Sequence, residues 1–292
     1  MTGHTSTGDG LPTRVSFNFL DRCNLACRFC YLPFDGRASA YDTWLDVVGR
    51  LVELGAESIT FGGGDPFRYR RFPELLGHVR AELPQITFVQ VDTNALGWAE
   101  RSLADIAATV DLVGLPVDGS TDAVHTRMRD RAGHLDRVLH VVERLQGQVP
   151  IKINTVVSRV NAGDLVQLGR LLSRYRIAIW SLYEFWPVGP IAVRNKPGFQ
   201  LGADEFAAAV DRVVSSCPDL PVEVNAAAAR SKSYFFTSQT GRAYAVDGAD
   251  PNAYVELGSV HDEDIVRKWL DHADPTSNAH RVRERRRRST PC

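Results

Sequence analysis

The sequence predicts an α/β fold, a partial (β/α)6 barrel followed by a small C-terminal α+β extension. Six β-rich apolar runs alternate with stretches whose apolar residues recur every three or four positions, the pattern of βα units on a mainly parallel sheet. Right-handed crossovers would curl six such units into an open barrel whose strand ends gather at one rim. We therefore expect the chemistry at that rim.

Each element of this fold follows from a local pattern. The predicted barrel strands cover residues 14–20, 58–63, 86–92, 111–118, 151–157 and 177–185. The predicted helices between them cover residues 43–55, 72–83, 99–110, 135–147 and 164–175.

The rhythm changes after the sixth strand. In order, we expect a loop over 188–202, a helix over 203–217, a short strand over 221–224, a hairpin over 233–247 turning at Thr240 and Gly241, and a last helix over Glu263–Asp271. The chain then divides into a disordered N-terminus (1–13), the barrel (14–190), the C-terminal extension (191–272) and a disordered arginine-rich tail (273–292).

Composition excludes several classes of protein. Of the 292 residues 44% are hydrophobic and 24% charged, and the net charge of -1 predicts no polyanionic partner. The tail RVRERRRRSTPC is expected to be solvated, and a salt-sensitive nucleic-acid contact is its less favoured interpretation. The N-terminus lacks signal-peptide features, and no apolar run approaches the roughly 20 residues that span a bilayer. We expect a cytoplasmic protein without membrane contact.

Three of the five cysteines, Cys23, Cys27 and Cys30, fall in CNLACRFC directly after the first predicted strand. Three thiolates so spaced can hold three irons of a [4Fe–4S] cluster and leave the fourth iron open. A structural zinc site wants four ligands, and a redox CxxC motif needs no third cysteine. We interpret Cys217 as an inert buried thiol and discount Cys292 at the chain end.

A glycine run, Gly62, Gly63 and Gly64, ends the second predicted strand at the same rim. Because glycine has no Cβ, a ligand can approach the backbone N–H and C=O groups there. Such groups can hold an amino-acid-like moiety, so the two loops together predict a site more strongly than either does alone.

The CxxxCxxC loop and the segment Gly63-Gly64-Asp65-Pro66 resemble those of the radical S-adenosylmethionine (SAM) enzymes, although Asp65 stands where that family more often has glutamate. The resemblance implies a TIM-like partial barrel, a [4Fe–4S] cluster, SAM bound at its open iron and an external electron donor such as flavodoxin or ferredoxin. One electron would cleave SAM to a 5′-deoxyadenosyl radical, which would take a hydrogen atom from a substrate.

The same resemblance implies roles for other residues of the SAM site. Phe29 matches an aromatic residue near the adenine, and Asp65 would accept a hydrogen bond from the methionyl amine. Arg159 would meet the SAM carboxylate. Thr93 and Asn94 match a polar pair near SAM, and Asp118 and Asn154 complete the residues predicted to bind it. Lys152 and Asn154, with Arg127 and Arg129 in HTRMRD, are also available for anionic or hydroxyl groups.

Residues 14–260 resemble viperin and its prokaryotic relatives within that family, but the sixth strand departs from them. It reads IWSLYEFWP, with Ser181 and Glu184 and no cation to hold a triphosphate. We therefore expect a small polar sugar-like or nucleoside-like substrate, contacted by Lys152, Tyr183 and Glu184 as catalytic residues, in specialised metabolism. The alternatives are a viperin-like nucleoside triphosphate dehydratase and a non-enzymatic metal-binding interaction protein.

Overall fold

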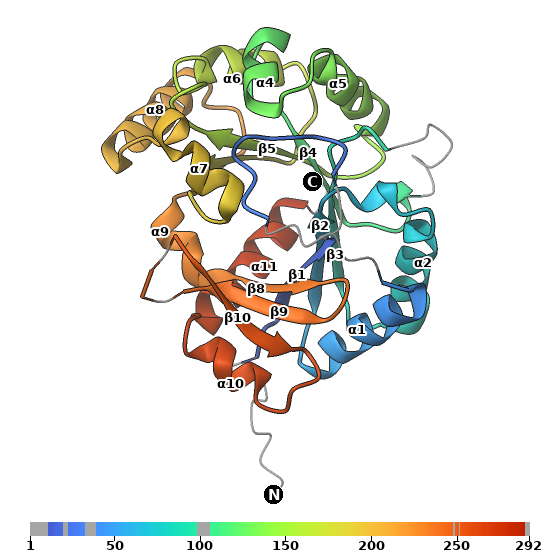
Figure 1. Ribbon diagram of the computed structural model, residues 1–292. Coiled ribbons are helices and arrows are strands. Elements are labelled where there is room, and N and C mark those ends of the chain that lie inside the picture. Colours follow the sequence, from blue (N-terminus) through green and yellow to red (C-terminus); the bar gives the residue numbers. More distant parts are fainter. Residues whose placement is uncertain are drawn as a thin grey trace, which may run out of the picture.

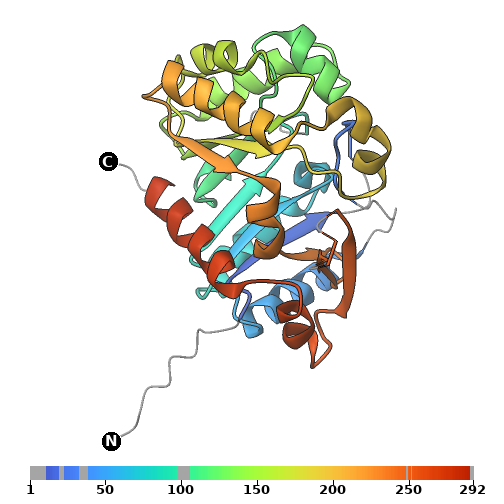
Figure 2. The same cartoon turned by 90° about the vertical axis from the view of Figure 1, so that its left-hand side faces the viewer.

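One mixed sheet organises the protein in the computed structural model, which describes residues 11–19, 23–32, 39–97, 106–247, 249–250 and 252–289 (Figures 1 and 2). Within these residues the strand order is β10-β9-β8-β1-β2-β3-β4-β5-β6-β7. The pairs from β1 to β7 are all parallel. The predicted α/β fold with a partial barrel is confirmed.

The six predicted barrel strands are all present. They are β1 (Arg14–Phe19), β2 (Ser58–Gly63), β3 (Phe88–Asp92), β4 (Leu112–Pro116), β5 (Ile151–Val157) and β6 (Ile179–Glu184). Alternate residues of a strand face opposite sides of the sheet. On β1 this places Val15 and Phe17 in the apolar core, whereas Ser16 and Asn18 line an internal cavity.

Helices cover the outer face of the barrel strands (Figure 1). The predicted helices appear as α1 (Tyr41–Glu53), α2 (Phe72–Glu82), α5 (His134–Leu145) and α6 (Leu165–Leu172). The helix predicted over 99–110 lies largely outside the described residues. An additional helix, α4 (Asp122–Arg129), begins after Thr121, whose side chain accepts a hydrogen bond from Val124 N.

The strands of the C-terminal extension continue the same sheet at both edges. Strand β7 (Val222–Asn225) pairs with β6, and β8 (Phe235–Ser238) pairs with β1. Strands β9 (Arg242–Val246) and β10 (Tyr254–Ser259) follow as antiparallel neighbours. The β8–β9 connection confirms the predicted hairpin, and Gly241 provides the positive φ of its turn, 78°. The remaining segments are η1 (Pro66–Arg68), α8 (Ala203–Ser216), α9 (Ala227–Arg230), η3 (Ser231–Ser233) and α10 (Ile265–Leu270).

The loop predicted over 188–202 is wrong, because Pro190–Phe199 form helix α7. Pro190 occupies the first turn, where a proline needs no N–H partner. Ala192 and Phe199 pack in a cluster with Cys27 and Phe29 beside the cysteine loop. Tertiary packing therefore stabilises a helix that contains an internal proline, Pro197.

The disordered tail predicted over 273–292 is wrong for residues 275–289, which form helix α11 (Pro275–Ser289). Its buried residues are Asn278, Val282, Arg285 and Ser289, spaced four, three and four positions apart on one face. Only one of them is apolar, so a search for apolar periodicity does not find this helix. Figure 2 shows α11 beside the N-terminal ends of the barrel strands. No helix in the described part of the chain is long and apolar enough to cross a membrane.

Candidate active site

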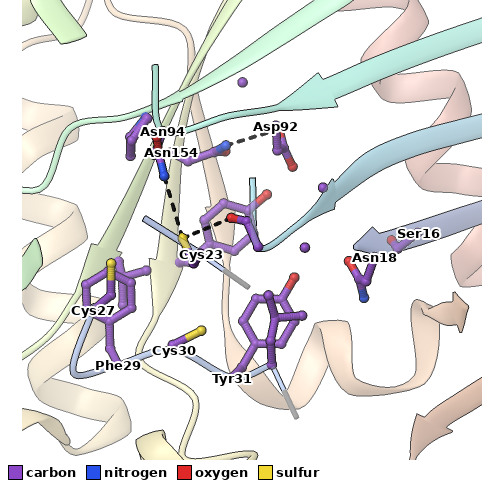
Figure 3. A pocket seen from close by; sticks show the side chains of 18 of the residues that line it. Ser16, Asn18, Cys23, Cys27, Phe29, Cys30, Tyr31, Asp92, Asn94 and Asn154 are labelled. Atoms are coloured by element: carbon purple, nitrogen blue, oxygen red, sulfur yellow. Dashed lines mark hydrogen bonds between the residues drawn. The ribbon is translucent and has the colours of Figure 1, made fainter. Parts of the chain in front are cut away.

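A cavity of about 320 Å³ runs inside the barrel from the cysteine loop to Arg14 at the start of β1. This volume lies in the range of small-molecule sites. The inner residues of the strands line it, together with the loops at their carboxyl ends (Figure 3). The cavity therefore has two ends, a rim at the cysteine loop and a floor at Arg14.

Cys23, Cys27 and Cys30 all line the rim as free thiols (Figure 3). A backbone hydrogen bond from Cys30 N to Cys27 O, at 3.1 Å, tightens the loop, and Cys23 Sγ donates to Gly64 O at the same distance. Burial raises the pKa of all three thiols, that of Cys30 to about 12. Stable thiolates therefore need added positive charge, which bound metal supplies.

These residues fit the [4Fe–4S] cluster that the sequence resemblance implies. Three sulfur donors share one loop and one cavity, with the glycine loop beside them. No three His, Cys, Asp or Glu side chains among the described residues are arranged to hold a single metal ion. Cys217 is buried at the end of α8, as the sequence predicted, and is not among the cavity-lining residues.

The glycine loop lines the cavity, but the acidic residue after it does not. Gly62, Gly63 and Gly64 face the cavity, whereas Asp65 has no exposed surface. Asp65 Oδ2 accepts hydrogen bonds from Thr93 Oγ1 at 2.9 Å and from Asn94 N at 2.7 Å.

Asp65 Oδ1 accepts a further hydrogen bond from Phe67 N, at the start of the η1 segment that Pro66 opens. Neither Asp65 nor Pro66 is among the cavity-lining residues, so the contact expected between Asp65 and the SAM amine is not formed by this arrangement. Asp65 instead fixes the loop after β3 against the glycine loop.

Thr93 and Asn94 lie at the rim, as predicted. Asn94 Nδ2 lies 3.6 Å from Cys23 Sγ (Figure 3), and Asn94 O accepts a hydrogen bond from His134 Nε2 at 2.7 Å. His134 Nδ1 in turn lies 2.8 Å from His125 Nε2, and His125 Nδ1 accepts from Asp118 N.

Only one proton arrangement satisfies this relay. Because Asp118 N–H can only donate and Asn94 C=O can only accept, both imidazoles carry their proton on Nε2 and are neutral. Burial agrees, lowering the pKa of His125 strongly and that of His134 to about 4. The relay joins two loops of the rim.

Asp118 acts through Arg129. Its carboxylate is fully buried, accepts from Arg129 Nε at 2.5 Å and from Val156 N at 2.7 Å, and does not line the cavity. Arg129 does line it, with its guanidinium 4.8 Å from the Phe29 ring centroid and Nη1 3.7 Å from Cys27 Sγ. Although burial opposes the charge, Asp118 raises the pKa of Arg129, so Arg129 stays cationic beside the cysteine loop.

Arg159 is not brought to the cavity, which corrects the role expected for it. Its side chain is exposed and Nη1 donates to Pro197 O at 3.4 Å. Among the described residues at the rim, Arg129 is the cation that a carboxylate of SAM could meet. The sequence marked Arg129 as available for an anionic group, but gave no signal that it lies beside the cysteine loop.

A polar pair occupies the middle of the cavity. Asn154 Nδ2 donates to Asp92 Oδ1 at 3.3 Å (Figure 3), which leaves Asn154 Oδ1 buried and without a partner among the described residues. Gly114 makes this contact possible, because a Cβ there would lie 1.8 Å from Asp92 Oδ1. The pair presents oxygen acceptors, which suit hydroxyl groups of a ligand.

The three predicted catalytic residues have different places. Tyr183 and Glu184 both line the cavity, but the Glu184 carboxylate accepts a hydrogen bond from Ala227 N at 2.8 Å. Lys152 is buried beneath the cavity and donates from Nζ to the Tyr183 hydroxyl at 2.6 Å. Burial and Arg285 lower the pKa of Lys152 to about 7.

Sequence comparison identifies relatives with several activities. Residues 17–172 match the profile of the Radical SAM superfamily. A GTP 3′,8-cyclase of Syntrophomonas wolfei is 30% identical over 192 residues, 62% of this chain and 58% of the cyclase. An S-adenosylmethionine-dependent nucleotide dehydratase of Flammeovirga pacifica is 24% identical over 288 residues, 90% of this chain and 97% of the dehydratase.

The chain spans only part of several other relatives. It covers 38% of the sporulation killing factor maturation protein SkfB of Bacillus subtilis, at 26% identity over 161 residues. Among solved structures, SuiB of Streptococcus suis bound to precursor peptide SuiA has a TM-score of 0.69 at 15% identity, covering 93% of this chain and 67% of SuiB. That likeness shows the shared fold. The sequence profile over more than half of the chain, together with the three-cysteine rim, identifies the protein as a member of the radical SAM superfamily, an enzyme that uses a [4Fe–4S] cluster and SAM.

Proposed function

We propose that this enzyme abstracts a hydrogen atom from a small polar, sugar-like or nucleoside-like substrate bound in the middle of the cavity. When bound, the cluster and SAM together supply a 5′-deoxyadenosyl radical, which can take a hydrogen atom from an unactivated C–H bond. The single observation that supports this substrate class is the Asp92–Asn154 pair, whose acceptors face a cavity lined by aromatic side chains.

The residues of this chain bind, orient and exclude water. Phe29, under Arg129, offers an apolar face at the rim, and Tyr31 and Trp186 add aromatic walls. Such walls suit a sugar or a base and keep water from the reacting carbon. The Tyr183 hydroxyl, held by Lys152, is a polar group at the same wall. We retain Tyr183 as a proposed catalytic residue and Lys152 as its positioning residue.

The test is anaerobic reconstitution with iron and sulfide followed by a strong reductant and SAM. We expect about four irons per chain and release of 5′-deoxyadenosine. Gly114→Ala tests the Asp92–Asn154 pair most directly, because the added Cβ would displace this pair and not the cysteine loop. Wild-type protein that binds iron but releases no 5′-deoxyadenosine would contradict the proposal.

A second candidate is a nucleoside triphosphate dehydratase. It is favoured by the match to the Flammeovirga pacifica dehydratase, which spans nearly the whole of both chains. Incubation with each of the common nucleoside triphosphates and a search for a product lighter by one water separates the two candidates.

We also propose, for either candidate, a reducing cytoplasmic compartment and an electron donor of the flavodoxin or ferredoxin type.

A further inference from the structure

The floor of the cavity gathers positive charge from parts of the chain that are far apart in sequence. The basic side chains that act there on one another or on the Tyr234 phenol, among the described residues, are Arg14 of β1, Lys152 of β5, Arg230 of α9, and Arg281 and Arg285 of α11. Of these, Arg14 and Arg230 line the cavity.

Three of these cations have defined partners. Arg285 Nη1 donates to Gln90 Oε1 at 2.9 Å, and its Nε lies 4.0 Å from Glu223 Oε1. Arg281 Nη1 donates to Asn225 Oδ1 at 2.6 Å, and Lys152 Nζ donates to the Tyr183 hydroxyl. The Glu223 carboxylate thus faces Arg285, behind the surface that the cavity presents.

Arg14 has no such partner in the part of the chain that the structure describes. Its side chain is 4% exposed, and neither Nε nor Nη1 finds an acceptor among the described residues. The guanidinium lies 5.2 Å from the centroid of the Tyr234 ring. Asn278 of α11 fixes the backbone below it, accepting from Arg14 N at 2.8 Å and donating to Arg14 O at 2.9 Å. A buried cation without an acceptor is costly unless a ligand supplies one.

Arg230 has a similar arrangement beside Trp186, whose ring centroid lies 6.1 Å from that of Tyr234. It is 7% exposed, donates from Nη2 to Glu184 O at 2.6 Å, and has no acceptor for Nε among the described residues. Its guanidinium lies 4.6 Å from the centroid of Trp186. Two buried guanidinium groups, each with an N–H that no described residue accepts, therefore border the same cavity.

The pKa values of Arg14 and Tyr234 reflect the same excess of positive charge at the floor. Burial and Arg285 lower the pKa of Arg14 to about 10. Although burial would raise the pKa of the Tyr234 phenol, the arginines around it, Arg281 and Arg230 first, lower it to about 8. A positive field with too few anions to balance it has both effects.

We propose that Arg14 and Arg230, over the rings of Tyr234 and Trp186, form a buried oxyanion subsite that holds an anionic group of the substrate at the floor of the cavity. Guanidinium groups offer paired N–H donors that match phosphate and carboxylate oxygens, and either group could provide the oxyanion. This inference rests on the proposed function and adds the charge of the substrate. The sixth strand carries no cation that could hold an anionic group, but in this subsite the cations come from β1 and α9.

The subsite sets the length of the substrate. Arg14 and Asn18 are four residues apart on β1, or about 13 Å along a strand. A substrate anchored at the floor must therefore extend toward Asp92 and Asn154 to bring a C–H bond near the rim. This favours a molecule with an oxyanion at one end and its hydroxyl groups at the other.

The test measures anion binding by calorimetry on the full-length, cluster-loaded protein with SAM and without reductant, using inorganic pyrophosphate and succinate as probes. We expect one probe to bind, with its affinity falling about 10- to 100-fold in Arg14→Gln and in Arg230→Gln, as for the loss of a hydrogen bond to a charged group. Tighter binding of pyrophosphate assigns a phosphate, and tighter binding of succinate assigns a carboxylate. Arg170→Gln, on the exposed face of α6, is the matched control and should bind as wild type.

Iron content distinguishes the possible failures. A variant that keeps about four irons per chain has a folded rim. If Arg14→Gln does not keep this iron content, the test uses Arg230→Gln only. If wild-type protein cleaves SAM but binds neither probe, or binds it no better than both variants do, the oxyanion subsite is wrong while the proposed function stands. If wild type holds no cluster, the proposed function fails first.

Discussion

The two ends of the cavity are built in opposite ways. The rim comes from short continuous segments, the cysteines at 23–30, the glycine loop at 62–64 and the pair Thr93 and Asn94. The floor is assembled from single side chains on β1, β5, α9 and α11, and its central anchor joins Asn278 to Arg14 across 264 residues. In our proposal the rim serves the cofactors that the superfamily shares, whereas the floor binds the substrate.

This difference predicts that damage to the rim abolishes the chemistry, whereas damage to the floor changes what is bound. Variants at each end, compared by the same measurements, test that distinction.

The largest effect is expected from Cys27→Ala. With two thiolates left, the cluster loses one of its three protein ligands, and iron should fall from about four to below about one per chain. SAM cleavage should be lost with it. Iron analysis and release of 5′-deoxyadenosine measure both. Cys217→Ala is the matched control, and an equal loss of iron in that variant would contradict the assignment of the cysteines.

Arg129→Met tests the ion pair behind the cysteine loop. Removing the cation leaves the Asp118 carboxylate buried without its partner, so the free energy of unfolding should fall by about 3–5 kcal/mol. Denaturant unfolding of the cluster-free protein measures it. The double variant Asp118→Leu/Arg129→Met should recover part of the loss. Simple additivity of the two single changes would contradict the coupling.

Asn278→Ala tests the link between α11 and the floor. The change leaves the buried N–H and C=O of Arg14 without partners, at a cost of about 3 kcal/mol in unfolding free energy. We expect weaker anion binding in the folded variant and unchanged iron content. Thr276→Ala, on the exposed side of the same helix, is the control. Loss of iron in Asn278→Ala would show that floor and rim are not separate.

The imidazole relay predicts a pH dependence at the rim. The unfolded chain takes up a proton on His134 below about pH 6.5, whereas the folded protein does so only below about pH 4. Stability from this group is therefore complete above pH 6.5 and lost as the pH falls, by about 2 kcal/mol at pH 5. Urea unfolding between pH 5 and 8 measures this dependence. The free energy of unfolding should change less steeply with pH in His134→Gln than in wild type or in His280→Gln. Identical slopes would contradict the neutral relay.

The smallest effect is expected from Arg159→Ala. Because this side chain is exposed and lies outside the cavity, stability should change by less than about 0.5 kcal/mol and SAM affinity by less than about twofold. Equilibrium dialysis with labelled SAM measures the affinity. A large loss of affinity would restore the role that the sequence suggested for Arg159.

The barrel and the segments of the rim could be predicted from the sequence because both depend on local patterns. Strand and helix periodicities predicted all six barrel strands, and the spacing of Cys23, Cys27 and Cys30 predicted one loop of cysteines, which lines the cavity. Errors arose where packing overrides local pattern. Helix α7 forms despite Pro197, and α11 buries a face that is mostly polar. Asp65 and Arg159 were placed in the site by motif position, but side-chain direction put both outside the cavity lining.

The sequence by itself determined the fold class, the three-cysteine loop proposed to hold the cluster and the glycine loop, because neighbouring residues in one segment must share one place in the fold. Only the tertiary structure decided that Arg129 rather than Arg159 faces the rim, and that Arg14 and Arg230 line the same cavity. No periodic pattern in the sequence indicates which groups will lie next to a charged side chain. Its energy depends on burial and on groups brought close from distant segments, and folding alone fixes both.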